Sequence, residues 1–314
     1  MICTKCSICS WKTSSSEEIH KDALINVTNL GKRYDGFHLE DIGLAVEAGT
    51  VVGLIGSNGA GKTTTIKMLL GILQPDEGEG EVLGCPIGKG MFLEGSVKER
   101  IGVVLDTCAF PETSKVKDVA TLGRFAYRNW DAKRFGALCE RFELAPKKNV
   151  KELSRGMGMK LMLAFALSHD PELLVLDEAT AGLDPMARDE VLDILRDFMK
   201  TEDHAILLST HITNDLEKIA DEIICIDGGK LVFNLSKDEV CDVAGVAHCR
   251  QRDLELIRES AWAEDERMRK LKSGMAYDVL VPDRFAFAKA FPNIALDSAS
   301  IDDYMTLALK GEQL

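Results

Sequence analysis

The chain has 314 residues, of which 46% are hydrophobic and 28% are charged, as in an ordinary globular protein. This length suggests one large domain or two moderate ones, and no run of about 18 apolar residues is present, so we expect no membrane-spanning segment. The formal net charge of −13, with no basic stripe to offset it, argues against nucleic acid as the main partner.

Residues 1–22 are polar and irregular and contain no apolar stretch typical of a secretory signal, so we expect a disordered leader. Within it, Cys3, Cys6 and Cys9 have a spacing that could begin an iron–sulfur or zinc site. His20 is nearby, but no fourth ligand with matching spacing follows, and the alternative is a leader that binds no metal. We expect the six other cysteines to be reduced thiols of a cytoplasmic protein.

From residue 23 onward, short apolar segments typical of strands alternate with helical patterns. The segments "ALINVTN" and "FHLEDIGLAV" precede "TVVGLIG", and the later apolar runs are "RIGVVLD", "ELLVLD", "AILLST" and "EIICID". This alternation predicts an α/β fold with a largely parallel sheet covered on both faces. We expect a main domain over residues 23–238 with a helical insert at about 107–168, and a small α+β unit over residues 239–314.

The sequence "GSNGAGKT" at residues 56–63 has the pattern G-x-x-x-x-G-K-[ST] and lies after a predicted strand and before a predicted helix. Gly56, Gly59 and Gly61 allow a tight loop whose N–H groups point toward an anion, and the helix N-terminus adds partial positive charge. Lys62 is expected to reach the β- and γ-phosphates of a nucleotide, and the Thr63 hydroxyl to bind Mg²⁺. A Gly-rich turn without a ligand is the alternative.

Two acids, Asp177 and Glu178, end the apolar segment "ELLVLD". Because adjacent residues on a strand point to opposite sides, Asp177 can face the Mg²⁺ shell while Glu178 turns toward an attacking water. His211 ends the later strand "AILLSTH", and neighbouring parallel strands would aim it at the same sheet edge. Solvated polar residues at strand ends are the alternative for all three.

These motifs, in this order over residues 23–235, resemble the ATP-binding subunit of ABC transporters. The resemblance implies a P-loop ATPase with a helical subdomain, an N-terminal antiparallel β subdomain and a C-terminal extension. It implies Glu178 and His211 as catalytic residues and Asp184, in "AGLDP", at a dimer seam. The ATP-binding residues implied are Tyr34, Gly56, Ser57, Asn58, Gly59, Ala60, Gly61, Lys62, Thr63 and Thr64.

In that family, two subunits pack head to tail, and a signature motif of one caps the γ-phosphate held by the other. Here "LSRGM" at residues 153–157 matches that motif, so Ser154 and Gly156 are the expected contacts in trans at a helix N-terminus. Gly156 and Gly158 are poor helix formers, each costing about 1 kcal/mol relative to Ala. The resemblance suggests that glycine permits a close approach of phosphate, whereas a bend in the helix is the alternative.

The chain also departs from the family pattern. Asp106 stands where the family has a glutamine that faces Mg²⁺, Arg155 and Met157 replace a Gly and the Gln of the signature, and Ala179 replaces the usual Pro. These features are similar to the bacterial YtrB-type subunits, which serve separately encoded permeases.

We therefore expect an ATPase that uses ATP and Mg²⁺, dimerises as a homodimer or heterodimer, and drives a transmembrane permease at the cytoplasmic face of the cell membrane. The alternatives are a soluble ABC-type ATPase that acts outside transport and a regulatory nucleotide-binding module. Long coiled-coil inserts or a second ATPase unit would favour the soluble ATPase. The presence of Glu178 and His211 argues against the regulatory module.

Overall fold

The computed structural model describes residues 23–314 except for residues 89 and 91–92. Its central sheet has six strands in the order β10-β9-β3-β8-β7-β6. All neighbouring pairs are parallel except β9 and β10, which form an antiparallel hairpin at one edge. The strands are β3 (Val51–Ile55), β6 (Ile101–Val104), β7 (Leu173–Asp177), β8 (Ala205–Ser209), β9 (Glu222–Asp227) and β10 (Lys230–Ser236). Every residue of β3, β7 and β8 is buried, as their continuous apolar sequences predict for a sheet covered on both faces.

The two faces of the central sheet belong to two separate hydrophobic clusters. Val51 and Ile55 of β3 face the cluster that contains α5, α6 and α7, whereas Val52 and Leu54 face the cluster that contains α1. The period of two along each strand produces this division. The helices are α1 (Lys62–Leu69), α5 (Arg155–Leu167), α6 (Pro185–Phe198) and α7 (Thr213–Ile219). The predicted α/β fold is therefore confirmed.

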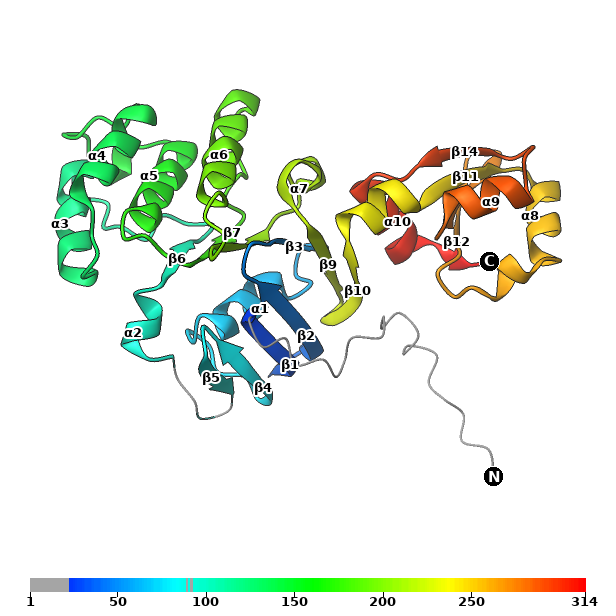
Figure 1. Ribbon diagram of the computed structural model, residues 1–314, viewed down its shortest axis with the longest axis horizontal. Coiled ribbons are helices and arrows are strands. Elements are labelled where there is room, and N and C mark those ends of the chain that lie inside the picture. The colour runs from blue at the N-terminus through cyan, green and yellow to red at the C-terminus, as the bar shows by residue number, and fades with distance from the viewer. Residues whose placement is uncertain (1–22, 89, 91–92) are drawn as a thin grey trace.

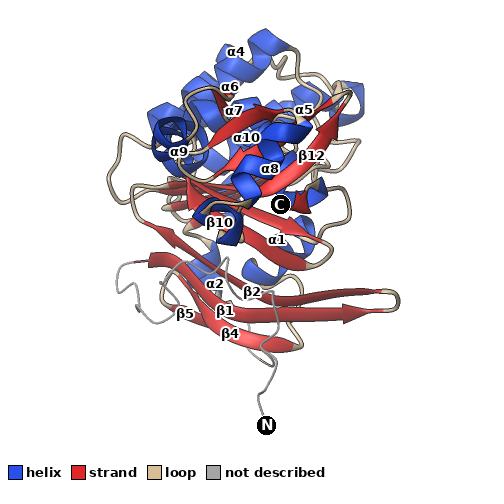
Figure 2. Cartoon of the chain, turned by 90° about the vertical axis from the view of Figure 1, so that its right-hand side faces the viewer, coloured by secondary structure: helices blue, strands red, loops and turns tan. Residues whose placement is uncertain are grey.

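A second sheet covers α1 on the side away from the central sheet, as Figures 1 and 2 show. It is antiparallel, with the order β2-β1-β4-β5. Its strands are β1 (Ala23–Tyr34), β2 (Phe37–Glu47), β4 (Glu77–Val82) and β5 (Cys85–Gly88). In β1 and β2, buried residues such as Ile25, Val27 and Leu44 alternate with more exposed ones, which is typical of a sheet with one buried face.

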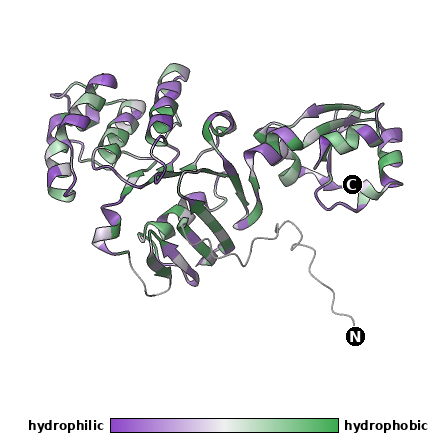
Figure 3. Cartoon of the chain, viewed as in Figure 1, coloured by the Kyte–Doolittle hydropathy of each residue, from purple (hydrophilic) through white to green (hydrophobic). Residues whose placement is uncertain are grey.

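The residues of the expected helical insert form a helical layer beyond β6 (Figure 1). Phe165 of α5 is its centre, because the rings of Phe110, Tyr127 and Trp130 all pack against that side chain. The insert also contains α3 (Val116–Ala126), α4 (Ala132–Arg141) and the 3₁₀ turn η1 (Val150–Glu152), whereas α2 (Gly95–Lys98) precedes β6. Ribbon colouring by hydropathy shows the central strands as mainly hydrophobic and the outer helices as mixed (Figure 3).

The C-terminal part of the chain forms a third, antiparallel sheet in the order β14-β11-β13-β12-β15. One face has its own core around Phe287, but Val246 and Leu280 belong to the main cluster together with Tyr304 of α10 and Phe233 of β10. The elements are η2 (Glu239–Val243), β11 (Gly245–Cys249), α8 (Gln251–Arg258), η3 (Ala261–Glu264), β12 (Arg269–Ser273), β13 (Ala276–Val281), α9 (Arg284–Ala290), β14 (Ala295–Ser298), α10 (Ile301–Lys310) and β15 (Glu312–Gln313).

The expected leader, with Cys3, Cys6, Cys9 and His20, lies outside the described residues. In the part of the chain that is described, no helix is both long enough and apolar enough to cross a membrane.

Candidate nucleotide-hydrolysis site

Residues 56–61 form the loop that joins the end of β3 to the start of α1. Gly56 has a φ of +148°, and a Cβ atom there would lie 1.9 Å from the carbonyl oxygen of Ile226 on β9, so only glycine fits. The Lys62 side chain is buried and its Nζ donates hydrogen bonds to the carbonyl oxygens of Gly56, at 2.8 Å, and Ser57, at 3.1 Å. The ammonium group therefore lies inside the loop, where an anion would meet it.

The hairpin of β9 and β10 holds this loop from the side. Ser57 Oγ donates a hydrogen bond to Asp227 Oδ1, and the Gly229 N–H donates to the carbonyl oxygen of Ala60 at 3.1 Å. Asn58 and Gly59 are exposed at the tip of the loop. The loop is thus anchored at both ends while its tip stays open to a ligand.

Thr63 and Asp177 meet at the end of β7, as a metal-binding pair requires. Thr63 Oγ1 donates to Asp177 Oδ2 at 2.8 Å, and the Asp177 side chain is 1% exposed. Its other oxygen, Oδ1, is buried without a hydrogen-bond partner, and so is the Oγ of the adjacent Ser209. An unpaired buried carboxylate oxygen fits a cation.

Thr63 and Asp177 offer one hydroxyl and one carboxylate to a cation. Within the described residues, no group of three or more His, Cys, Asp or Glu side chains is placed to hold a metal ion. Mg²⁺ is commonly held by one or two carboxylates together with substrate phosphates rather than by an all-protein cage. Thr63 and Asp177 fit that pattern.

Glu178 and His211 lie together at the same edge of the sheet. Glu178 Oε2 is 2.6 Å from His211 Nδ1, and the Glu178 backbone N–H donates to the carbonyl oxygen of Ser209 at 2.9 Å. The Glu178 side chain is mostly buried, whereas His211 is half exposed. Because β7 and β8 are parallel neighbours, their carboxyl ends bring these two side chains together, as the sequence predicted.

The expected signature residues begin a helix. Ser154 is the N-cap of α5, and its Oγ accepts a hydrogen bond from the Met157 N–H at 3.2 Å. A Cβ atom on Gly156 would lie 2.8 Å from Leu183 Cδ2, so glycine here lets α5 pack closely against the loop before α6. This internal contact gives a reason for Gly156 that the sequence did not suggest.

Three further expected site residues lie in other places. Tyr34 is the half-exposed last residue of β1, opposite Phe37. Asp184 is the N-cap of α6, and its Oδ1 accepts from the Ala187 N–H at 3.0 Å. Asp106 is exposed and lines a cavity of about 430 Å³ together with Ser154. The magnesium role of Asp106 stays a prediction.

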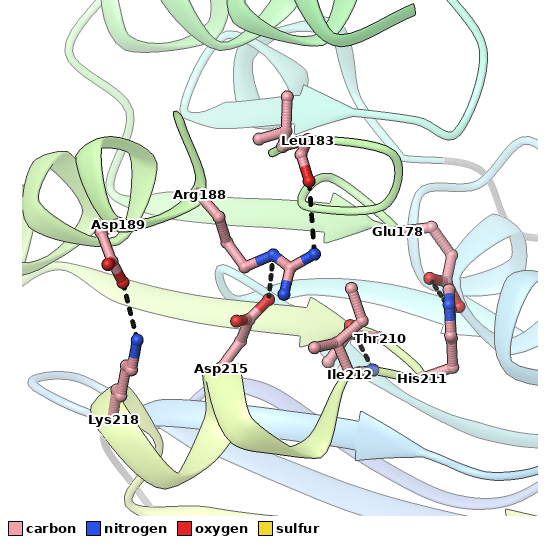
Figure 4. A network of polar contacts seen from close by, with 9 residues as sticks. All are labelled: Glu178, Leu183, Arg188, Asp189, Thr210, His211, Ile212, Asp215 and Lys218. Carbon is pink, nitrogen blue, oxygen red and sulfur yellow. Dashed lines mark hydrogen bonds and ion pairs between the residues drawn. The ribbon is translucent and has the colours of Figure 1, made fainter. Parts of the chain in front are cut away.

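One polar network near the site was not found from the sequence (Figure 4). Arg188 on α6 contacts the buried Asp215 on α7, with Nε 3.8 Å from Oδ2. Burial raises the pKa of Asp215, and the charge of Arg188 opposes that effect. Neither residue belongs to a motif, and only the packing of α6 against α7 brings them together.

Comparisons with known proteins identify the family of the chain. Residues 39–181 match the ABC transporter family model. The chain is 36% identical over 225 residues to the daunorubicin resistance ATP-binding protein DrrA3 of Streptomyces coeruleorubidus, an alignment that covers 70% of each chain. It is 34% identical over 230 residues to the Nod factor export ATP-binding protein I of Cupriavidus metallidurans, covering 70% of this chain and 73% of that protein.

The fold agrees with these relatives. A solved structure of an ATP-binding subunit of an ABC transporter superposes with a TM-score of 0.63 at 28% identity, covering 69% of this chain and 91% of that one. The similarity to YtrB-type subunits in particular stays a prediction. The chain therefore belongs to the ATP-binding proteins of ABC transporters, a family of ATPases.

Proposed function

We propose that this ATPase works as a head-to-tail pair of subunits around two ATP·Mg²⁺ and drives a separately encoded permease. The observation that carries the proposal is that the described chain has two separate features, and we propose that each is one half of an ATP site. One is the loop at residues 56–63 with Asp177, Glu178 and His211 beside it. The other is the exposed start of α5 with Ser154 as its N-cap.

The first half-site supplies the groups that phosphoryl transfer needs. Lys62 and the loop N–H groups stabilise the charge that develops on the γ-phosphate, and Thr63 and Asp177 would hold Mg²⁺, which would neutralise phosphate charge when bound. Glu178 orients the attacking water and accepts its proton. His211, held against Glu178 at 2.6 Å, contacts the γ-phosphate.

The second half-site supplies a helix N-terminus, which favours an anion. Ser154 and Gly156 of one subunit then cap the γ-phosphate bound by its partner, and Asp184 lies at the seam between the two subunits. Each of the two ATP sites then contains residues from both subunits, which is the arrangement of a closed pair with two-fold symmetry.

A mixing experiment tests the pairing. Lys62→Ala removes the phosphate-binding ammonium group, and Gly156→Asp adds negative charge to the first turn of α5, together with a Cβ atom that would crowd Leu183. We expect each variant to be inactive alone and the mixture to regain partial ATPase activity, because one site of the mixed pair then has neither defect. Full activity of Gly156→Asp alone, or no activity in the mixture, would contradict the proposal.

Gly158→Ala is the matched control for the glycine substitution. Its added Cβ atom would lie at 3.4 Å from Cys108 Cβ, an ordinary contact, in the same helix. We expect this variant to keep wild-type ATPase activity. If Gly158→Ala is as inactive as Gly156→Asp, the start of α5 serves helix geometry rather than phosphate binding.

The names of two relatives refer to drug resistance and to Nod factor export, which supports a role in transport. From that role we infer a permease partner and a location at the cytoplasmic membrane face. The test is co-purification in detergent of the tagged chain with a multi-span protein encoded beside it. ATPase activity that rises when that protein is present would support transport, and failure to associate with any such neighbour would favour a role outside transport.

A further inference from the structure

Helices α6 and α7 each begin directly after a loop of the site, and one largely buried ion pair joins them. Arg188 lies in the first turn of α6, and Asp215 lies in the first turn of α7. Arg188 Nε is 3.8 Å from Asp215 Oδ2, and the two side chains are 26% and 1% exposed. Figure 4 shows that Arg188 lies between Asp215 and the loop that precedes α6.

The guanidinium group of Arg188 also reaches that loop. Its Nη2 donates a hydrogen bond to the carbonyl oxygen of Leu183 at 3.3 Å, immediately before Asp184. The Leu183 side chain in turn packs against the first turn of α5, where a Cβ atom on Gly156 would lie 2.8 Å from Leu183 Cδ2. Arg188 is therefore two contacts away from the helix N-terminus that we propose serves the partner's ATP.

In the other direction, Arg188 holds the helix that follows His211. Only Ile212 separates His211 from the start of α7, and the Ile212 N–H donates to Thr210 Oγ1 at 3.0 Å. Because the connection is this short, a displacement of α7 would also move His211 and its contact with Glu178. Arg188 Nε makes no hydrogen bond to Asp215, so the contact at 3.8 Å is an ion pair, whereas Nη2 donates to the Leu183 carbonyl. The extended guanidinium group reaches both partners at once, which the single ammonium group of a lysine does less well.

We propose that Arg188 is a positioning residue that fixes, through Asp215, the His211 loop of its own site and, through Leu183, the start of α5 that serves the partner's site. The second half of this inference rests on the head-to-tail pairing proposed above. Arg188 touches neither substrate nor reacting atoms in this role.

The chain offers a matched control on the same two helices. Lys218 of α7 and Asp189 of α6 form an ion pair at 2.6 Å, but their side chains are 46% and 61% exposed. Exposed ion pairs contribute little to stability. Lys218→Met therefore removes a link between α6 and α7 without touching Leu183 or the buried Asp215.

The first experiment compares Arg188→Met, Arg188→Lys and Lys218→Met. The readouts are kcat per bound nucleotide, KM and thermal stability. We expect Arg188→Met to lower kcat by about tenfold to a hundredfold with KM changed far less, because misplaced site groups cost rate. Lys218→Met should stay within about twofold of wild type. A purely structural role of Arg188 would lower stability and the folded fraction and leave kcat per bound nucleotide unchanged.

The second experiment separates the two directions by mixing. In the first mixture, Arg188→Met is combined with excess Lys62→Ala. Only the site whose phosphate loop comes from Arg188→Met can then be active, so the assay reports the link from Arg188 through Asp215 to His211 (the His211 arm). In the second mixture, Arg188→Met is combined with excess Gly156→Asp. Only the site whose α5 start comes from Arg188→Met can then be active, so the assay reports the link from Arg188 through Leu183 to the start of α5 (the Leu183 arm). Relative to wild type in the same mixtures, we expect both activities to fall.

Arg188→Lys refines this test and also replaces Arg188→Met if that variant does not fold. A lysine keeps a positive charge beside Asp215, so the His211 arm should recover more than the Leu183 arm. Equal recovery of both arms, or loss of neither arm, would overturn the linking role.

The two proposals fail in different ways. If Lys62→Ala and Gly156→Asp do not complement each other, the head-to-tail pairing is wrong, and the kcat of Arg188→Met alone still decides whether Arg188 positions its own site. If they complement but Arg188→Met and Lys218→Met behave alike, the pairing stands and the positioning role of Arg188 is wrong.

Discussion

Glu178 has a backbone conformation that is uncommon for a residue with a side chain. Its φ is +54°, directly after the extended strand β7. The Ser209 carbonyl accepts its N–H, and this contact holds the turn in place. The turn directs Glu178 toward His211 while Asp177, one residue earlier, stays with Thr63. The opposite directions of the two acids were predicted from the strand, whereas the left-handed turn was not.

Glu178→Gln preserves the shape of this turn and removes the proton acceptor. We expect ATP binding within about threefold of wild type and a fall in turnover of roughly a hundredfold or more, in the range of general-base losses. The variant should accumulate as an ATP-bound dimer in size-exclusion chromatography. Hydrolysis that persists while the protein remains monomeric would show that Glu178 has a different role.

His248 gives the third sheet a pH-dependent element. It lies on β11 between two acids on the neighbouring strands, with Nδ1 2.7 Å from Asp278 Oδ1 and Nε2 3.1 Å from Asp297 Oδ2. The hydrogen bond to Asp278, followed by the one to Asp297, raises the pKa of His248 above its ordinary value of about 6.5. A raised folded-state pKa stabilises the fold below the unfolded pKa, and this contribution is lost as the pH rises through the folded pKa.

The expected result is a pH-dependent difference between wild type and His248→Gln. Thermal unfolding should show the largest advantage of the wild type below about pH 6.5, with the difference shrinking as the pH rises through the folded-state pKa, which lies above that value. Because the His248 side chain is 44% exposed, solvent screens the effect and it should be small. A difference that stays constant over this pH range would mean that charge on His248 does not contribute.

At the scale of elements, the turn between β9 and β10 joins the phosphate loop to the second sheet. Gly229 has a φ of +81°, and a Cβ atom there would lie 1.8 Å from the carbonyl oxygen of His38 on β2. The adjacent Gly228 has a φ of +53°, but nothing lies within 4 Å of its added Cβ. The Gly229 N–H also supports the loop through Ala60.

The two neighbouring glycines form a matched pair for mutation. Gly228→Ala should cost about 1 kcal/mol of unfolding free energy from backbone strain alone. Gly229→Ala should cost several times more and weaken ATP binding, because β2 and the phosphate loop must both shift. Chemical denaturation and calorimetric titration with ATP measure the two effects. Equal stability losses in the two variants would show that the contact with β2 is not tight.

The elements differ in how far the sequence determines them. The strands β3, β7 and β8 are continuous apolar runs, and the α5 cap follows from Ser154 before an apolar helix, so both were predictable. Local sequence contains no signal for the contact of Gly156 with Leu183 or of Arg188 with Asp215. Those contacts depend on how α5, α6 and α7 pack, and packing joins residues far apart in the chain.

At the scale of the whole molecule, the third sheet is not independent of the ATPase core. Tyr304 of α10 is 2% exposed, and its ring packs edge-on against Phe233 of β10 with centroids 5.0 Å apart. The Ile301 N–H donates to Glu217 Oε1 of α7 at 3.0 Å. The expectation of a small C-terminal unit came from a looser pattern after residue 238, and that pattern could not reveal the shared core.

Tyr304→Ala should therefore destabilise both parts together. We expect a loss of about 3–5 kcal/mol, as for other large-to-small changes in a core. ATPase activity should also be lost at a lower temperature. Tyr304→Phe keeps the ring and should stay close to wild type. Thermal inactivation of ATPase activity measured beside calorimetric unfolding checks this, and inactivation at the wild-type temperature in Tyr304→Ala would show that the third sheet unfolds on its own.

The strand order of the central sheet has a consequence for synthesis on the ribosome. β3 leads into the phosphate loop, yet it pairs with β8 and β9, and its first N–H donates to Asp221, which is 170 residues later in the chain. At about 5–20 residues per second, roughly 10–30 s pass between translation of β3 and of its partners. During that interval the nascent chain exposes β3 as an apolar strand with unpaired edges. Slower translation would lengthen this exposure, and we expect a chaperone that binds the nascent chain to bind this segment.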